Sequence, residues 1–224
     1  MRTYSVRIGT GKIQRRLRRE ENMRKILILT IVSLFLAFSA WAEPAEPAKP
    51  VEWKLDAAHS GVSFSVRHLG ISNVKGKFGE FAAKIQAEKE TGKITDLEAT
   101  IKTASINTGI DARDKHLRSD DFFNAEKFPE MKFKAKSIKF NGNIVTVEGD
   151  LTIRDATKPI TFTGEYVGVQ KANFGQGEQL RAGYTLVGKL NRFDYNLKWN
   201  NLMEGVALVG DTVTISIEAE ISNK

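Results

Sequence analysis

Residues 211–222 read DTVTISIEAEIS, and this stretch decides the fold class. Apolar side chains alternate with threonine, serine or glutamate from Val213 to Ile221. Because successive side chains of an extended chain point to opposite faces, the alternation predicts a strand with one buried and one solvent-facing side. The same period recurs at 62–66 and at 97–101.

Further strand-like segments lie near 76–87, 131–140, 144–153, 159–169 and 180–192. Turn signals such as Asn141-Gly142 and Gly210-Asp211 separate them. About eight closely spaced amphipathic strands are typical of an antiparallel sandwich or barrel, and a barrel removes the edges that invite aggregation. We therefore expect an all-β protein built as an eight-stranded antiparallel barrel, with an interior either filled by side chains or wide enough for one small ligand.

The positive charge of the chain is concentrated at its N-terminus. The first 42 residues hold nine basic and two acidic side chains, which leaves 25 of each sign in residues 43–224. A neutral body argues against a nucleic-acid partner. The absence of cysteine excludes disulfides, thiol chemistry and cysteine-based metal sites.

Residues 23–42 have the three parts of a secretory signal: the basic start MRK, the apolar run 26–39 and the cleavage site Ala40-Trp41-Ala42. The apolar run is short for a membrane span and prolines follow it, so we predict cleavage after Ala42 over a permanent membrane anchor. Residues 1–22 are interpreted as an upstream start-site extension, 43–50 as a Pro/Ala linker and 51–224 as the barrel. The expected location is the periplasm.

Residues 111–123, DARDKHLRSDDFF, form the one predicted helical segment. Asp111 is expected to cap it, and Ile110 and Leu117, seven residues apart, to face the barrel and carry Arg113 and Asp114 with them.

Three interpretations of this segment remain open. Arg113, Asp114 and His116 could form a buried network that closes one mouth of the barrel, since buried charges must be paired. Arg113 could instead contact the polar head of a ligand through its fork of donors. Catalysis by Asp114 and His116 is the third interpretation, although no nucleophile accompanies them at a recognised spacing.

The histidines offer little support for other chemistry. His59, His68 and His116 could supply three imidazoles, but the odd separation of His59 and His68 points them to opposite faces of a continuous strand. Asp56, His59 and Ser60 suggest a triad, yet adjacent residues would diverge, so capping or turn hydrogen bonds are expected there. We predict no metal, no cofactor and no catalytic residue.

The candidate ligand site consists mainly of apolar and aromatic side chains on or near the inferred inner face. The predicted ligand-binding residues are Phe64, Val66, Phe81, Ile101, Arg113, His116, Phe122, Phe123, Phe133, Phe162, Tyr184 and Leu186.

Five stretches form a recognisable set: WKLDAAHSGVSFSVRHLG (53–70), VKGKFGEF (74–81), SINTGIDARDKHLRSDDFFNAEKFPEMKF (105–133), GDLTIRDATKPITF (149–162) and NRFDYNL (191–197). Together and in this order they resemble the YceI-like family of exported, lipocalin-like proteins associated with polyisoprenoid binding. The resemblance covers residues 51–224 and implies an extended lipocalin-like barrel that holds a long isoprenoid or similar amphiphile, without an established enzymatic step. Two departures stand out: Asp155-Ala156 where the family pattern has Gly-Val, and Tyr195-Asn196 where it has Phe-Gly.

The predicted function is a periplasmic binding or carrier protein for an isoprenoid-type or other long-chain lipid, with no permanent membrane insertion and with a homodimer left open. One alternative is a hydrolase or isomerase that uses Asp114 and His116. The other is a ligand-free envelope stress or structural protein. Lipid in the purified protein, turnover lost on changing His116, and a cavity too small for a chain would distinguish the three.

Overall fold

The computed structural model describes residues 15, 18–23, 49–173, 175, 177–200, 202–203 and 206–224. Residues 15 and 18–23 are helical and exposed, and belong to a separate unit, Met1–Pro47. Almost all of the predicted signal peptide and linker lies outside the described residues. No helix among those described is both long and apolar enough to cross a membrane.

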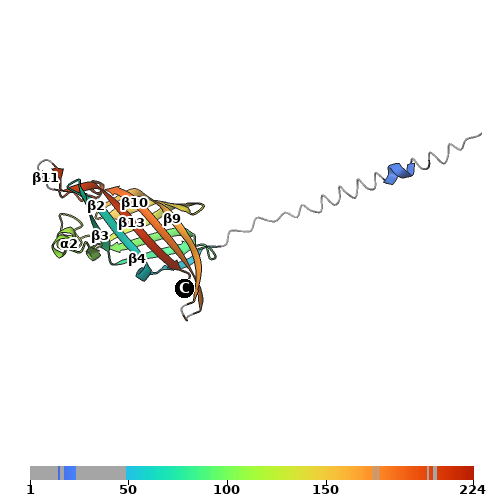
Figure 1. Ribbon diagram of the computed structural model, residues 1–224, viewed down its shortest axis with the longest axis horizontal. Helices are drawn as coiled ribbons and strands as arrows, with labels where there is room; N and C mark the ends of the chain where they lie inside the picture. The colour runs from blue at the N-terminus through green and yellow to red at the C-terminus, as the bar shows by residue number, and fades with distance from the viewer. Residues whose placement is uncertain are drawn as a thin grey trace, which may run out of the picture. The chain divides into compact units, whose positions relative to one another are not determined.

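The second unit, Ala48–Lys224, is built almost wholly of strands (Figure 1). In chain order its described elements, with η for a 3-10 helix, are β1 (Val51–Leu55), η1 (Ala57–His59), β2 (Gly61–His68), β3 (Ser72–Phe78), β4 (Phe81–Ala87), β5 (Ile94–Lys102), η2 (Thr103–Ser105), β6 (Ile106–Asn107), α2 (Asp111–Arg118), β7 (Glu130–Asn141), β8 (Ile144–Ile153), β9 (Ala156–Asn173), β10 (Glu178–Asn191), η3 (Arg192–Tyr195), β11 (Leu202–Met203), β12 (Val206–Ala207) and β13 (Val209–Ser222).

Eight strands close into a ring in the order β1-β4-β5-β7-β8-β9-β10-β13, because β13 pairs with β10 along one edge and with β1 along the other. All of these pairings are antiparallel. The eight-stranded antiparallel barrel predicted from the alternation is therefore confirmed. The amphipathic stretch 213–221 lies in β13, which closes the ring.

At three places in the barrel wall, two successive strands with a break between them occupy the position of one long strand. β2 continues β1 along the same edge of β13, β3 continues into β4 after a two-residue break, and β6 follows β5 after η2. At the η2 break, the Thr103 hydroxyl donates to the carbonyl of Phe128 at 2.6 Å. The segment 76–87, predicted as one strand, is thus two.

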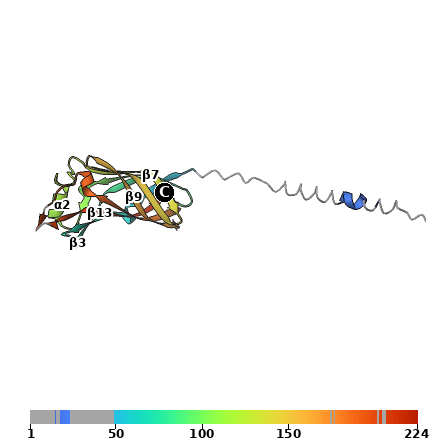
Figure 2. The same cartoon turned by 90° about the horizontal axis from the view of Figure 1, so that it is seen from above.

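The helix α2 follows β6 and lies beside β3 at one end of the barrel, and the C-terminus lies at the other end (Figures 1 and 2). The turn between β4 and β5 folds across that second end. The Tyr184 hydroxyl donates to the carbonyl of Gly92 at 2.6 Å and accepts from the amide of Ile94 at 3.1 Å. Trp53 packs beneath this turn and is only 1% exposed. This end of the barrel is therefore closed.

One predicted turn is correct and one is wrong. Asn141-Gly142 joins β7 to β8, with Gly142 in the left-handed region at a φ of 61°. Gly210-Asp211 instead lies inside β13, where the register against β2 shifts between Val209 and Val213. The glycine serves a close approach to Arg67 of the neighbouring strand.

Gly164 in β9 lies where the backbones of β9 and β10 approach each other closely, and a substitution there tests this contact. A Cβ atom at this position would strike the backbone of Thr185 and Leu186 in β10. Gly164→Ala should lower the free energy of unfolding by about 1 to 3 kcal/mol, because the backbone must shift to accept the methyl group. Urea denaturation measures this. Gly61→Ala is the control, since a Cβ there meets nothing within 4 Å; equal losses in both variants would contradict the expectation.

Candidate functional site

An elongated cavity with a volume of about 220 Å³ runs inside the barrel. Its lining is apolar along most of its length. Ten of the twelve residues predicted to bind a ligand line it, namely Phe64, Val66, Phe81, Ile101, Phe122, Phe123, Phe133, Phe162, Tyr184 and Leu186. The placement of the eight that lie in strands follows from strand parity, because each predicted strand presents alternate residues to the interior, whereas Phe122 and Phe123 lie in the turn after α2. Whether they bind a ligand remains a prediction.

The cavity is long and narrow. β13 contributes lining residues from Val209 to Ile221, which corresponds to roughly 40 Å of strand and roughly 30 Å along the axis of a barrel whose strands tilt by about 40°. A volume of about 220 Å³ over this length leaves room for one slender chain.

Aromatic rings contact one another along the lining. Phe78 lies between Phe64 and Phe123, with ring centroids 5.8 and 5.9 Å apart. Phe133 and Phe162 meet edge to face at 5.5 Å. Such contacts stabilise the rings beyond their burial.

The polar residues of α2 are organised around Thr108, just before the helix. Asp114 is buried and accepts hydrogen bonds from the backbone amide of Thr108, at 2.9 Å, and from its hydroxyl, at 2.5 Å. The Arg113 Nε donates to the same hydroxyl at 2.7 Å, and Nη2 donates to the Thr108 carbonyl at 3.0 Å. The Asp114 carboxylate and the Arg113 guanidinium therefore both hold Thr108 in place, in the backbone just before α2.

Several expectations for this helix are wrong. Its N-cap is Ile110, which forms no side-chain cap, so Asp111 does not cap it; Asp114 satisfies a nearby backbone amide instead. Ile110 is 52% exposed and does not anchor the helix inward, whereas Leu117 lines the cavity as predicted.

His116 is separate from the Arg113 and Asp114 pair. Its Nε2 lies 2.7 Å from a carboxylate oxygen of Asp121, and its ring meets Phe122 and Trp199 edge to face, with centroids 5.1 and 4.9 Å away. The single Arg113/Asp114/His116 network, the first of the three interpretations, does not form. Neither Arg113 nor His116 lines the cavity, so the structure does not bring these two predicted ligand contacts to the site.

Arg192 lines the cavity, and the sequence analysis missed it. It begins η3 at the α2 end of the barrel and is only 2% exposed. Its guanidinium donates to the backbone carbonyls of Gly210, Trp199, Val209 and Leu197, and it stacks over the ring of Phe193. Burial lowers the pKa of this guanidinium. The only signal in the sequence is a basic residue at the end of a predicted strand, which is common on surfaces.

The two departures from the family pattern contact each other. The Asn196 side-chain amide donates to a carboxylate oxygen of Asp155 at 3.0 Å, and this bond lowers the pKa of Asp155. Asn196 adopts the left-handed conformation with a φ of 61°, which asparagine tolerates better than most residues. Two positions where the family pattern has glycine thus carry a hydrogen-bonded pair that joins the β8–β9 turn to η3.

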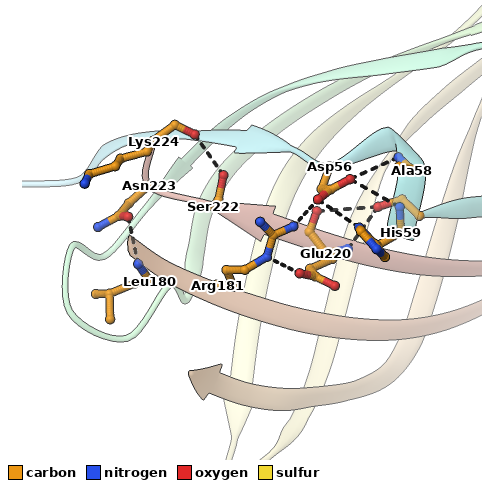
Figure 3. Close-up of polar contacts among 10 residues, drawn as sticks. Asp56, Ala58, His59, Leu180, Arg181, Glu220, Ser222, Asn223 and Lys224 are labelled. Atoms are coloured by element: carbon orange, nitrogen blue, oxygen red, sulfur yellow. Dashed lines mark hydrogen bonds and ion pairs between the residues drawn. The ribbon is translucent and has the colours of Figure 1, made fainter. Parts of the chain in front are cut away.

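A polar cluster on the outer wall was the remaining candidate for a metal (Figure 3). Asp56, His59 and Glu220 offer ligand atoms within 4.8 Å of one another. Arg181 lies between the two carboxylates and forms ion pairs with both, so the site already contains a cation. Asp56 also accepts from the backbone amides of Ala58 and His59 and caps η1, in agreement with the expected capping role. In the part of the chain that the structure describes, His68 and His116 do not join this cluster.

Comparisons with known proteins agree with this architecture. A family model described as a YceI-like domain matches residues 53–221. A UPF0312 protein of Staphylococcus aureus (strain N315) is 38% identical over 168 residues, which cover 75% of this chain and 95% of the relative. A UPF0312 protein of Photorhabdus laumondii is 37% identical over 148 residues, 65% of this chain and 76% of the relative.

Solved structures show the same fold. The crystal structure of the Campylobacter jejuni YCEI protein matches with a TM-score of 0.61 and 35% identity, over 70% of this chain and 90% of that one. A polyisoprenoid binding domain from Saccharophagus degradans, implicated in plant cell wall breakdown, matches with a TM-score of 0.54 and 16% identity, over 75% and 97% of the two chains.

Asp114→Ala tests the structural role of the α2 polar group. The change leaves the partly buried amide and hydroxyl of Thr108 without their acceptor, so the free energy of unfolding should fall by about 2 to 3 kcal/mol, as for hydrogen bonds to a charged group. Asp111→Ala is the matched control, because Asp111 is exposed in the same helix. Denaturation curves compare the two. If both variants melt like the wild type, the Thr108 contacts do not hold this end of the barrel together.

The Asp56 cluster predicts a specific loss of stability in acid. Hydrogen bonds from His59 and Arg181 lower the pKa of Asp56 to about 2. Because its pKa is lower in the folded than in the unfolded chain, the ionised carboxylate stabilises the fold above about pH 4, and this contribution is lost as the pH falls towards 2. Since the side chain is partly exposed, we expect about 1 kcal/mol.

In Asp56→Asn, the free energy of unfolding should fall less steeply between pH 5 and pH 2 than in the wild type. Urea denaturation at several pH values measures this. Asp111→Asn, which removes an exposed carboxylate from α2, serves as the control for net charge. Profiles of wild type and Asp56→Asn that run parallel through the whole range would contradict the assignment.

Proposed function

Because the chain belongs to the YceI-like family, we propose that it binds a long-chain lipid of the isoprenoid type inside the barrel. The observation that carries the proposal is the cavity: it is apolar, about as long as the barrel, and wide enough for a single chain. An apolar interior of this kind binds hydrocarbon and excludes water.

The energetics of such a cavity suit a carrier. About ten buried methylene-sized groups, at about 0.8 kcal/mol each, contribute about 8 kcal/mol before the costs of association. Micromolar binding requires about 8 kcal/mol after those costs, so affinity in that range needs a longer buried chain or an added polar contact to the head group. The similar domain from Saccharophagus degradans is described as polyisoprenoid binding, and this supports the ligand class proposed here.

We propose that the protein carries or sequesters its lipid in the periplasm after cleavage behind Ala42. A lipid that crosses an aqueous compartment needs shelter from water, which explains why a barrel with an apolar interior would be exported.

Binding without a chemical step is part of the proposal. The alternative hydrolase or isomerase needs Asp114 and His116 to act on one substrate. Asp114 is engaged by Thr108, His116 lies against Asp121, and neither lines the cavity. The alternative of a ligand-free structural protein would leave the length and apolar character of the cavity without a purpose.

Ala99→Phe tests the proposal by filling the cavity. Ala99 lines it and pairs with Ala83 and Phe133, so an added ring would enter the space that a chain occupies. The delipidated variant should remain folded and bind a twenty-carbon isoprenoid alcohol at least about tenfold more weakly than the wild type, as measured by native mass spectrometry. Val167→Phe adds the same ring to an exposed position on β9 and should bind like the wild type.

Protein purified from its own cells should also release a long-chain lipid on solvent extraction. If the delipidated wild type takes up no isoprenoid alcohol at micromolar concentrations, the proposed function is wrong.

A further inference from the structure

Arg192 is the one fully buried charged residue among those that line the cavity. The other polar lining residues already have protein partners. The Tyr184 hydroxyl bonds to Gly92 and Ile94 at the closed end, and Glu218 accepts from Thr185. Ser60 and Ser63 bond to backbone carbonyls of β13. Arg192 is therefore the charged donor available for a further polar contact inside the cavity.

The guanidinium has one donor to spare. An arginine carries five N–H groups. Nε donates to Gly210, the two hydrogens of Nη1 go to Leu197 and Trp199, and Nη2 donates one hydrogen to Val209 at 3.2 Å. The second Nη2 hydrogen has no acceptor among the described residues. A buried donor without a partner is unfavourable, and an oxygen atom placed there gains a charge-assisted bond.

We propose that Arg192 binds the head group of the lipid, and that this head is a neutral group with a single oxygen acceptor, such as a hydroxyl, a phenol or a carbonyl. The inference rests on the proposed function and specifies the class of lipid. It also gives the lipid an orientation: the head lies at the α2 end, beside η3, and the tail extends towards the closed end below Trp53 and Tyr184.

The surroundings of Arg192 disfavour a phosphate or pyrophosphate head. Such a group needs several donors to replace its water, yet one N–H is free and the lining holds no lysine and no second arginine. Four carbonyl oxygens already surround the guanidinium, and their partial negative charges would repel an added anion. One neutral oxygen matches one free donor.

Three probes with the same twenty-carbon isoprenoid chain test this on the wild-type protein: geranylgeraniol, its hydrocarbon without the oxygen, and geranylgeranyl phosphate, each delivered from cyclodextrin to the delipidated protein. The alcohol should bind at least about tenfold more tightly than the hydrocarbon, the value of one hydrogen bond to a charged donor. The phosphate should bind no more tightly than the alcohol.

Each outcome decides a separate point. Equal binding of alcohol and hydrocarbon would overturn the head-group site while the proposed function stands. A phosphate that binds about tenfold more tightly than the alcohol would overturn the neutral class. Failure of all three probes to bind would reject the proposed function itself, and this inference with it.

Two variants, Arg192→Gln and Arg192→Lys, test whether the preference for the alcohol over the hydrocarbon depends on Arg192. In the glutamine variant the preference for the alcohol should fall below about threefold while hydrocarbon binding is unchanged; an unchanged preference would overturn the role of Arg192. The lysine variant keeps the charge and should retain part of the preference.

Because Arg192 also holds four backbone carbonyls, a second measurement uses the unaltered chain. A geranylgeraniol analogue with a photoreactive diazirine next to its hydroxyl should crosslink near Arg192, Leu197 and Val209. Crosslinks at Trp53 or Tyr184 would reverse the orientation and overturn the inference.

Discussion

The architecture depends on the two edges of β13. One edge pairs with β10 from Thr212 to Ser222, and the other is shared between β1 and β2, which meet it in succession. Without the short pairing of Lys54 with Ser222 and Leu55 with Ile221, the wall would be an open sheet with two exposed edges. Closure encloses the inner faces of all eight strands at once, so the apolar cavity results from the same pairing that gives the fold.

The fold was predictable because apolar and polar residues alternate along most of its strands. Residues such as Phe162 and Leu186 lie in regular strands, and their side-chain direction follows from their place in the alternation. The irregular elements were not predictable in this way. Ile110 and Leu117 have helical spacing, yet a helix of eight residues contacts the barrel at one end only, so Leu117 is inside and Ile110 is exposed. Gly210-Asp211 has the composition of a turn, but the residues on either side of it are paired, Val209 with β2 and Thr212 with β10, and this keeps it in a strand.

The polar part of the site was harder to foresee because it is built from backbone. Sequence reasoning looks for a carboxylate to pair with a buried arginine, and among the described residues Arg192 has none; its partners are carbonyl oxygens that every residue carries. Arg154 follows the same principle nearby, donating to the carbonyls of Phe122, Asp120 and Asn196. Two arginines thus order the loops around one end of the barrel. The hydrogen bond between Asp155 and Asn196 joins the same loops through side chains. The sequence showed that both residues depart from the family pattern, but not that they contact each other.

The pairing of β1 with β13 also determines the order in which the chain can fold. One edge of β1 pairs with the nearby β4, but its other edge pairs with β13, and the Ser60 hydroxyl accepts from the amide of Glu220, 160 residues later, so this second edge finds its partner only when the last strand is present. Contacts between such distant segments form late, because the loop between them must first be ordered. A chain delivered from its N-terminus therefore keeps unpaired strand edges until its final dozen residues arrive. Until then β1 and β2 have to be kept from pairing with other chains, which makes escort by a chaperone most valuable in the interval before the C-terminus emerges.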